Sequence, residues 1–187
     1  LGEADLRAYD FTPLDISSGC NRSLKQPFGQ DANKQIDFGD LKTGRIKCYD
    51  VPFEILNDSA TGGKSLAMVS TWKDMSPRVT LPVHRNADCL FFLGNVSMWS
   101  GSSITAQYTV HYADGTKKIV VLRPGFEIGD LDGARPAFCP AQIKGKSRDG
   151  RPTAVNLYAV LTDPNQEIPF SAIQNRTLEI LEREWAE

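Results

Sequence analysis

Two tryptophans in polar turns are the residues of this sequence best suited to binding a ligand. Trp99 lies within the loop sequence NVSMWSGSS, and Trp72 begins the turn WKDMSPR. A flat indole can stack on the apolar face of a sugar ring while neighbouring side chains hold the hydroxyls. With Arg78 and Asn95 as neighbours, Trp99 and Trp72 form the predicted ligand site. The alternative is that each indole fills the end of the core, as large aromatics commonly do.

Acidic turns are the second chemical feature. Asp130 and Asp132 flank Leu131 in GDLDG, and hard oxygen ligands in loops are what calcium binds. A calcium site needs six to eight such ligands, and acidic residues also occur in turns simply because they are solvated there. A calcium ion at Asp130 and Asp132 is therefore one hypothesis and a solvated turn is the other. No other cofactor is expected, since two histidines and four dispersed cysteines do not suit a transition-metal site.

No catalytic residue is predicted. The stretch Gly62-Gly63-Lys64-Ser65 resembles a phosphate-binding loop, but Asp58 stands where that motif requires glycine. We expect a hairpin turn there, followed by a strand from Ser65 to Trp72. His84 and His111 are the chain's two histidines, and no G-x-S-x-G motif accompanies them. Composition singles out no pair among the 23 acidic residues for glycoside hydrolysis.

The four cysteines indicate buried thiols more than a disulfide framework. Cys20, Cys48, Cys89 and Cys139 permit three complete pairings, and their spacing selects none of them. Cys89 lies within the apolar run DCLFFL and behaves there as a small hydrophobic residue. We therefore expect mostly free thiols.

The central structural signal is the stretch QYTVHYADGTKKIVVL, from Gln107 to Leu122. Two runs of β-branched and aromatic residues flank Asp114-Gly115, a strong hairpin signal. With a two-residue turn, Val110 faces Ile119 and Tyr112 faces Lys117, so His111 lies opposite Lys118. The hairpin then has one apolar face, and a second layer must cover it. The residues of this predicted face are Tyr108, Val110, Tyr112, Ile119 and Val121.

Further strands are predicted along the chain at short intervals. They are VPFEIL (51–56), SLAMVSTW (65–72), VTLPVH (79–84), CLFFLG (89–94), FEIGDL (126–131), PAFCPAQI (136–143) and AVNLYAVL (154–161). Many short strands with frequent turns predict an all-β fold, an antiparallel two-sheet β-sandwich. We expect one domain over 1–187, with a core at 9–173 and a tail at 174–187.

The tail differs from the rest because Thr177 to Trp185 has helical periodicity. Leu178, Leu181 and Trp185 fall on one face of a short C-terminal helix, with a final strand as the alternative. This face could pack on the body of the protein or dock a catalytic domain or partner chain.

Composition excludes two classes of function. The net charge of −2 and the scattered lysines do not form the basic patch of a nucleic-acid-binding protein. No apolar run has the length of a membrane span. The chain begins at Leu1 without a methionine, which fits a processed precursor or an excised piece of a longer protein.

Several stretches taken together resemble a known family. NRSLKQPF, GDLKTGRIKCYDVPFEIL, GGKSLAMV, LFFLGNVSMW, YTVHYADGT, FEIGDL, VNLYAV and DPNQEI occur in that order between Tyr9 and Ile173. They are similar to a galactose-binding-like, jelly-roll β-sandwich module of bacterial polysaccharide-degrading proteins, often attached to glycoside hydrolases. The resemblance implies a non-catalytic carbohydrate-binding or accessory module of a secreted, periplasmic or cell-surface bacterial protein.

Two other functions stay open beside that expectation. One is a small glycoside hydrolase or lyase on the same sandwich, for which two convergent carboxylates would be required. The other is a structural docking domain that uses the face of Leu178, Leu181 and Trp185.

Overall fold

The computed structural model describes residues 10–27, 37–48, 50–70, 75–94, 106–123, 128–129, 142–146 and 152–175. Within these ranges the chain consists of β-strands, turns and two short 3-10 helices, η2 (Ser17–Gly19) and η4 (Asp58–Ala60). The strands are β1 (Gly44–Cys48), β2 (Val51–Ile55), β3 (Arg78–Arg85), β4 (Cys89–Gly94), β5 (Ala106–His111), β6 (Lys117–Leu122), β7 (Gln142–Lys146), β8 (Pro152–Leu161) and β9 (Ile168–Asn175). The prediction of an all-β, antiparallel protein is confirmed.

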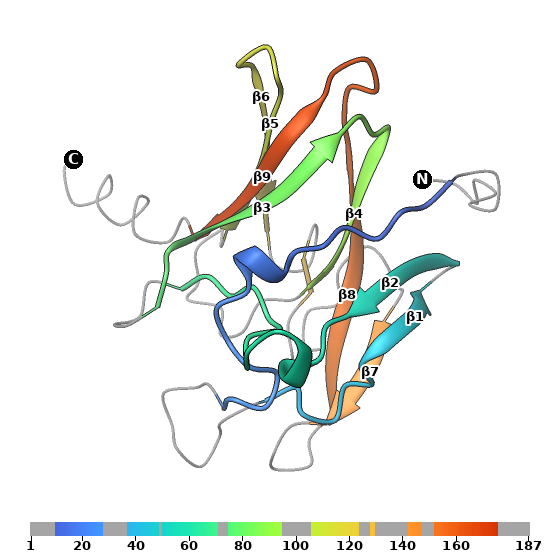
Figure 1. Cartoon of the computed structure of the whole chain (residues 1–187), viewed down its shortest axis with the longest axis vertical. Coiled ribbons are helices and arrows are strands. Elements are labelled where there is room, and N and C mark those ends of the chain that lie inside the picture. Colours follow the sequence, from blue (N-terminus) through green and yellow to red (C-terminus); the bar gives the residue numbers. More distant parts are fainter. Residues whose placement is uncertain are drawn as a thin grey trace.

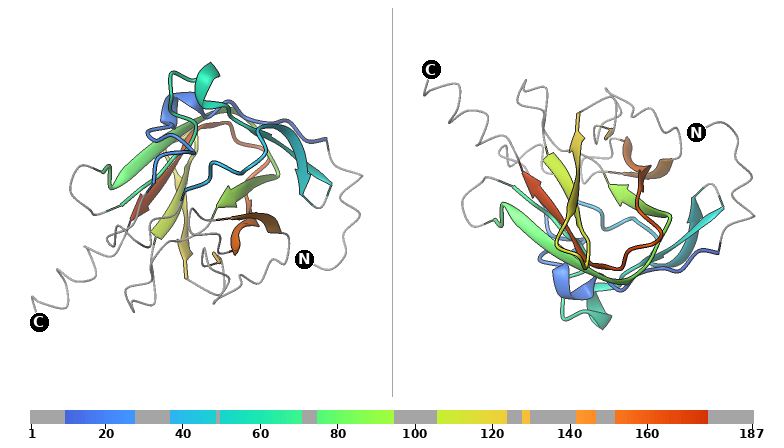
Figure 2. Two further views of the ribbon diagram at one scale, coloured as in Figure 1. Left: turned by 90° about the horizontal axis from the view of Figure 1, so that it is seen from below. Right: turned by 90° about the horizontal axis from the view of Figure 1, so that it is seen from above.

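The strands form three antiparallel sheets (Figure 1). The largest has the order β3-β9-β5-β6, the second has the order β4-β8-β7, and β1 pairs with β2 alone. In the views of Figure 2, the four-stranded sheet and the β4–β8 strands are facing layers, and the β1–β2 hairpin lies beyond β4. The β1–β2 hairpin packs against side chains of β4.

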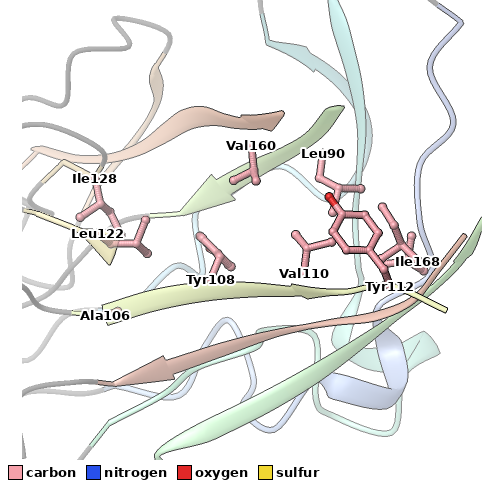
Figure 3. Packing of buried hydrophobic residues seen from close by; sticks show 10 residues of the cluster. Leu90, Ala106, Tyr108, Val110, Tyr112, Leu122, Ile128, Val160 and Ile168 are labelled. Atoms are coloured by element: carbon pink, nitrogen blue, oxygen red, sulfur yellow. The ribbon is translucent and has the colours of Figure 1, made fainter. Parts of the chain in front are cut away.

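The main core fills the space between the two larger sheets (Figure 3). Tyr108, Val110 and Tyr112 project from β5 and its turn toward Leu90 of β4 and Val160 of β8. The ring of Tyr108 stacks on that of Phe92, also on β4, with centroids 4.2 Å apart. Alternate residues of β4 and β5 thus pack together in one apolar core, which joins the two larger sheets.

Strand β4 packs against apolar residues on both of its faces. Leu90 and Phe92 face the main core, whereas Phe91 and Leu93 pack with Cys48, Val51 and Phe53 of the β1–β2 hairpin. The ring of Phe91 also meets Phe11 edge-on, at 5.6 Å between centroids. This explains the continuous apolar run CLFFL, because a strand covered on both sides has no polar face.

The β5–β6 hairpin has a different register from the one predicted. A three-residue turn, Ala113 to Gly115, replaces the predicted two-residue turn. The N–H of Tyr112 donates to the backbone carbonyl of Thr116 at 3.0 Å. Gly115 takes a positive φ of 85°, which glycine adopts without strain. Val110 consequently lies opposite Lys118, and Thr109 lies opposite Ile119.

This shift of one residue corrects the predicted apolar face of β6. Val120 and Leu122 turn toward the core, while Ile119 and Val121 are 47% and 37% exposed on the opposite side. The prediction for Tyr108, Val110 and Tyr112 is correct, but that for Ile119 and Val121 is wrong. A change of one residue in turn length moves every side chain of the second strand to the other face.

Two further differences concern strands. The predicted strand from Ser65 to Trp72 is absent over its described part, where Leu66 forms only an isolated bridge with Arg22. The preceding glycines therefore do not form a hairpin turn. Strand β9, which the sequence analysis did not predict, lies between β3 and β5 in the largest sheet. Its Pro169 and buried Ser171 weaken the pattern that marks a strand.

Several predictions fall wholly or partly outside the described residues. Of FEIGDL only Ile128 and Gly129 are described, and Ile128 belongs to the main core. Strand β7 overlaps the end of PAFCPAQI, and the C-terminal helix lies outside the described residues. In the part of the chain that is described, no helix has the length and apolar character needed to cross a membrane.

Candidate functional site

The structure describes one of the four predicted ligand residues. Arg78 is exposed and begins β3, at the edge of the four-stranded sheet. Trp72, Trp99 and Asn95 lie outside the described residues, as do the calcium candidates Asp130 and Asp132. The docking residues Leu178, Leu181 and Trp185 lie outside them too.

Arg78 belongs to the outer face of the four-stranded sheet, the side that points away from β4. Register fixes this face: His111 lies beside Lys117 on β6 and beside Phe170 on β9. Its residues with binding chemistry are Arg78, His111, Lys117, Ile119, Val121 and Phe170. Two aromatic rings, two cations and two exposed aliphatic side chains thus share one surface across four strands.

The stacked pair of His111 and Phe170 lies at the end of the outer face next to the β5–β6 turn. Their ring centroids are 4.3 Å apart and the planes differ by 27°. Burial lowers the pKa of His111 below its usual value, and the charges of Arg78 and Lys117 lower it further. His111 is therefore neutral at neutral pH, so its imidazole carries both a donor and an acceptor. The predicted register placed Lys118 opposite His111, whereas Lys117 lies there.

A polar row adjoins this pair on β5. Gln107 and Thr109 are both 7% exposed, and the amide of Gln107 donates to the hydroxyl of Thr109 at 3.2 Å. On the outer face, the side chains of Gln107 and Thr109 are therefore buried, whereas those of Ile119 and Val121 are exposed. Ligand contacts on the described part of this face would come from its rim of rings and cations.

Three connections meet at one end of the four-stranded sheet. Ala113 donates its N–H to Glu167 at 2.9 Å, and Asp163 donates its own to the hydroxyl of Tyr112 at 3.0 Å. The amide of Asn86 reaches the carbonyl of Pro164 at 3.1 Å. These bonds satisfy backbone groups and fix the turns together. Among the described residues, no group of three or more His, Cys, Asp or Glu side chains is arranged to hold a metal ion.

The glycine-rich stretch that resembles a phosphate loop has a structural role centred on Asp58. The Asp58 carboxylate accepts from the hydroxyls of Ser23 (at 2.5 Å) and Ser65 and from the N–H of Leu24 at 3.3 Å. The hydrogen bonds from Ser23 and Ser65 lower the pKa of Asp58. Asp58 therefore links the segment of Ser23 and Leu24 to the segment of Ser65. The N–H of Gly63 donates to the backbone carbonyl of Asp58 at 2.7 Å.

Cys20 and Cys89 are free thiols. Cys20 and Cys48 are buried and Cys89 is half-buried. Burial raises the pKa of both Cys20 and Cys89 to about 11, so these thiols are protonated and unreactive near neutral pH. Cys139 lies outside the described residues.

Phe170 was not predicted as a surface aromatic because strand β9 was not predicted. A signal was present: IPF follows the turn DPNQE, and Ile168 and Phe170 are apolar. Comparison of the chain with family models, curated proteins and solved structures found no match.

Proposed function

We propose that this protein is a non-catalytic carbohydrate-binding or accessory module with a galactose-binding-like, jelly-roll topology, exported by a bacterium. The proposal follows from the resemblance of the sequence to such modules. It is compatible with antiparallel sheets that face one another across one core. Sugar would bind at Trp99, Trp72, Arg78 and Asn95, and at the part of the outer face formed by Phe170 and His111.

The observation that carries the proposal is the half-exposed pair of Phe170 and His111 on a surface shared with Arg78. Sugar rings present apolar C–H faces and hydroxyl edges, which suit a flat ring beside neutral imidazole and guanidinium groups. Such contacts are weak for one module, and several copies or several modules in one polypeptide would strengthen binding.

The test is a glycan array followed by calorimetry, with and without calcium. Phe170→Leu removes the ring and keeps apolar volume, so we expect binding to weaken by about tenfold, which corresponds to ~1.4 kcal/mol. Phe53→Leu is the matched control, because Phe53 is also half-buried but belongs to the β1–β2 hairpin. An equal loss in both variants, or no glycan bound by the native protein, would contradict the proposal.

Trp99→Ala extends the same test to the predicted loop site. We expect it to weaken glycan binding without changing the unfolding midpoint, since an indole that stacks on sugar contributes little to the core. An unchanged affinity for glycan would show that Trp99 is not part of the binding site. Release of reducing ends from a bound glycan would instead favour the alternative of a glycoside hydrolase or lyase.

A further inference from the structure

The two edges of the four-stranded sheet differ in how they are protected. On β3, Pro82 lacks a backbone donor and the register shifts between Pro82 and Arg85, where His84 adopts a positive φ of 50°. Prolines and bulges of this kind prevent another strand from adding to an edge. Strand β6 is the other edge within the described residues, and its pairing with β5 runs without a shift from Lys117 to Leu122.

The turn determines which backbone groups of β6 point outward. Tyr112 is hydrogen-bonded to Thr116, and hydrogen-bonded pairs recur at every second residue of an antiparallel ladder. Lys118, Val120 and Leu122 therefore direct their N–H and C=O groups toward β5. The N–H and C=O groups of Lys117, Ile119 and Val121 point to the open edge.

The same residues expose apolar side chains. Ile119 and Val121 are the exposed large hydrophobic residues among those the structure describes. Free backbone groups and exposed aliphatic side chains thus coincide on alternate positions, which is the arrangement that accepts an added β-strand. Lys117 and Lys118, both exposed, flank this edge at its N-terminal end.

Charge decides between two occupants of the edge. A second copy of β6 paired antiparallel about Val120 would place Lys117 opposite Arg123, and both are exposed cations. Like charges directly opposite one another destabilise a strand pair. An acidic segment would meet Lys117 and Lys118 with opposite charge.

We propose that the edge of β6 binds an extended, acidic peptide segment of a partner protein by β-strand addition. Its apolar side chains lie beside Ile119 and Val121, and its carboxylates lie beside Lys117 and Lys118. This interaction is separate from glycan binding and does not depend on it.

Amide hydrogen exchange tests whether the edge is open. In the isolated protein, followed by NMR, the amides of Ile119 and Val121 should exchange more than about tenfold faster than those of Val120 and Leu122. Equal protection of the four amides would show that the edge is already paired and would overturn the proposal.

Peptide titration tests the occupant. The probe is the capped six-residue peptide Thr-Val-Thr-Val-Glu-Glu, which in antiparallel pairing places Val beside Ile119 and Val121 and Glu beside Lys117 and Lys118, and the control peptide has Lys in place of each Glu. We expect the acidic peptide to bind at least about tenfold more tightly, to weaken with added salt, and to protect the amides of Ile119 and Val121. Absence of binding, equal binding of both peptides, or a dimer of the protein in light scattering would overturn the proposal.

Two variants localise the binding. Ile119→Pro removes an outward N–H and no ladder hydrogen bond, so the fold should persist while the acidic peptide loses affinity by about tenfold or more. Lys117→Glu combined with Lys118→Glu keeps every backbone group and should reverse the preference between the two peptides. If the proline variant does not fold, the charge-reversed variant decides: an unchanged preference would overturn the proposal.

Discussion

At the scale of single residues, His111, which stacks on Phe170, makes the stability of the protein depend on pH. Because burial and nearby cations lower its folded-state pKa, the unfolded chain takes up a proton first as the pH falls. The contribution of neutral His111 to the free energy of unfolding is therefore fully present above the ordinary histidine pKa, near 6.5. It declines as the pH falls toward the lower folded-state pKa. The loss should be a few tenths of a kcal/mol, because solvent screens a half-exposed ring.

Urea unfolding at pH 7.5 and 5.5 measures this effect. His111→Phe keeps a ring against Phe170 without a titrating group, so its free energy of unfolding should fall less between the two values than that of the native protein. His84→Gln is the control, because it replaces an exposed histidine at the bulge of β3, away from the stacked pair. The same pH dependence in His111→Phe and the native protein would contradict the assignment to His111.

Asp58 supports a second prediction. Asp58→Ala removes the acceptor shared by Ser23, Ser65 and Leu24, so we expect a loss of about 2 kcal/mol in the free energy of unfolding. Asp58→Asn keeps one oxygen and should lose about 1 kcal/mol. Asp40→Ala, at an exposed carboxylate, is the control and should change stability little. Urea denaturation of the three variants measures these differences.

The sign of its pH dependence follows from the lowered pKa of Asp58. Above pH ~5 the carboxylate is charged in the folded and unfolded states, and its full contribution is present. As the pH falls through ~4 toward the folded-state pKa, the unfolded chain is protonated first and the contribution declines. The difference between the native protein and Asp58→Asn should therefore shrink at low pH. A constant difference would contradict the role of the ionised carboxylate.

At the scale of elements, the packing of η2 against β3 depends on Gly19. A Cβ at this position would lie 2.6 Å from Cδ2 of Leu81 and 2.8 Å from the carbonyl oxygen of Thr80. Gly19→Ala should therefore separate η2 from β3 and cost about 1–3 kcal/mol. Ser18→Ala, at the exposed neighbour in η2, should change the unfolding midpoint little. Equal midpoints for Gly19→Ala and the native protein would show that η2 moves freely from β3.

The elements also show where sequence patterns were sufficient. Strands β3 and β4 were predicted within a residue or two because VTLPVH alternates and CLFFL is apolar throughout. The hairpin was predicted, but its register was not, since Asp114-Gly115 is compatible with turns of two or three residues. Strand β9 was missed because Pro169 and the buried Ser171 interrupt its apolar pattern, while the apolar Phe170 lies on the outer face.

The candidate site was harder to predict than the fold because it is assembled across strands. Arg78, His111 and Phe170 share one face only through the order β3-β9-β5-β6, which no local pattern contains, and Arg78 lies opposite Gln174 whereas Phe170 lies opposite His111. The sequence could identify residue types suited to sugar, as with Arg78. It could not pair His111 with Phe170, because that contact follows from the position of an unpredicted strand.

At the scale of the whole molecule, β4 connects two cores. Phe92 packs into the core between the larger sheets, and Phe91 packs against the β1–β2 hairpin next to Cys48. The hairpin buries much less apolar surface than the main core, so we expect it to open without unfolding of the rest. Cys48, which is 6% exposed, then becomes accessible through this local opening.

Alkylation of Cys48 by iodoacetamide, followed by mass spectrometry, measures that opening. Phe91→Leu should weaken the hairpin contact by roughly 1 kcal/mol and speed labelling of Cys48 about fivefold relative to Cys20. Phe92→Leu should destabilise the main core by a similar amount and leave this ratio near its native value. If both variants speed labelling of Cys48 and Cys20 equally, the layers open together, and β4 joins them into one cooperative unit.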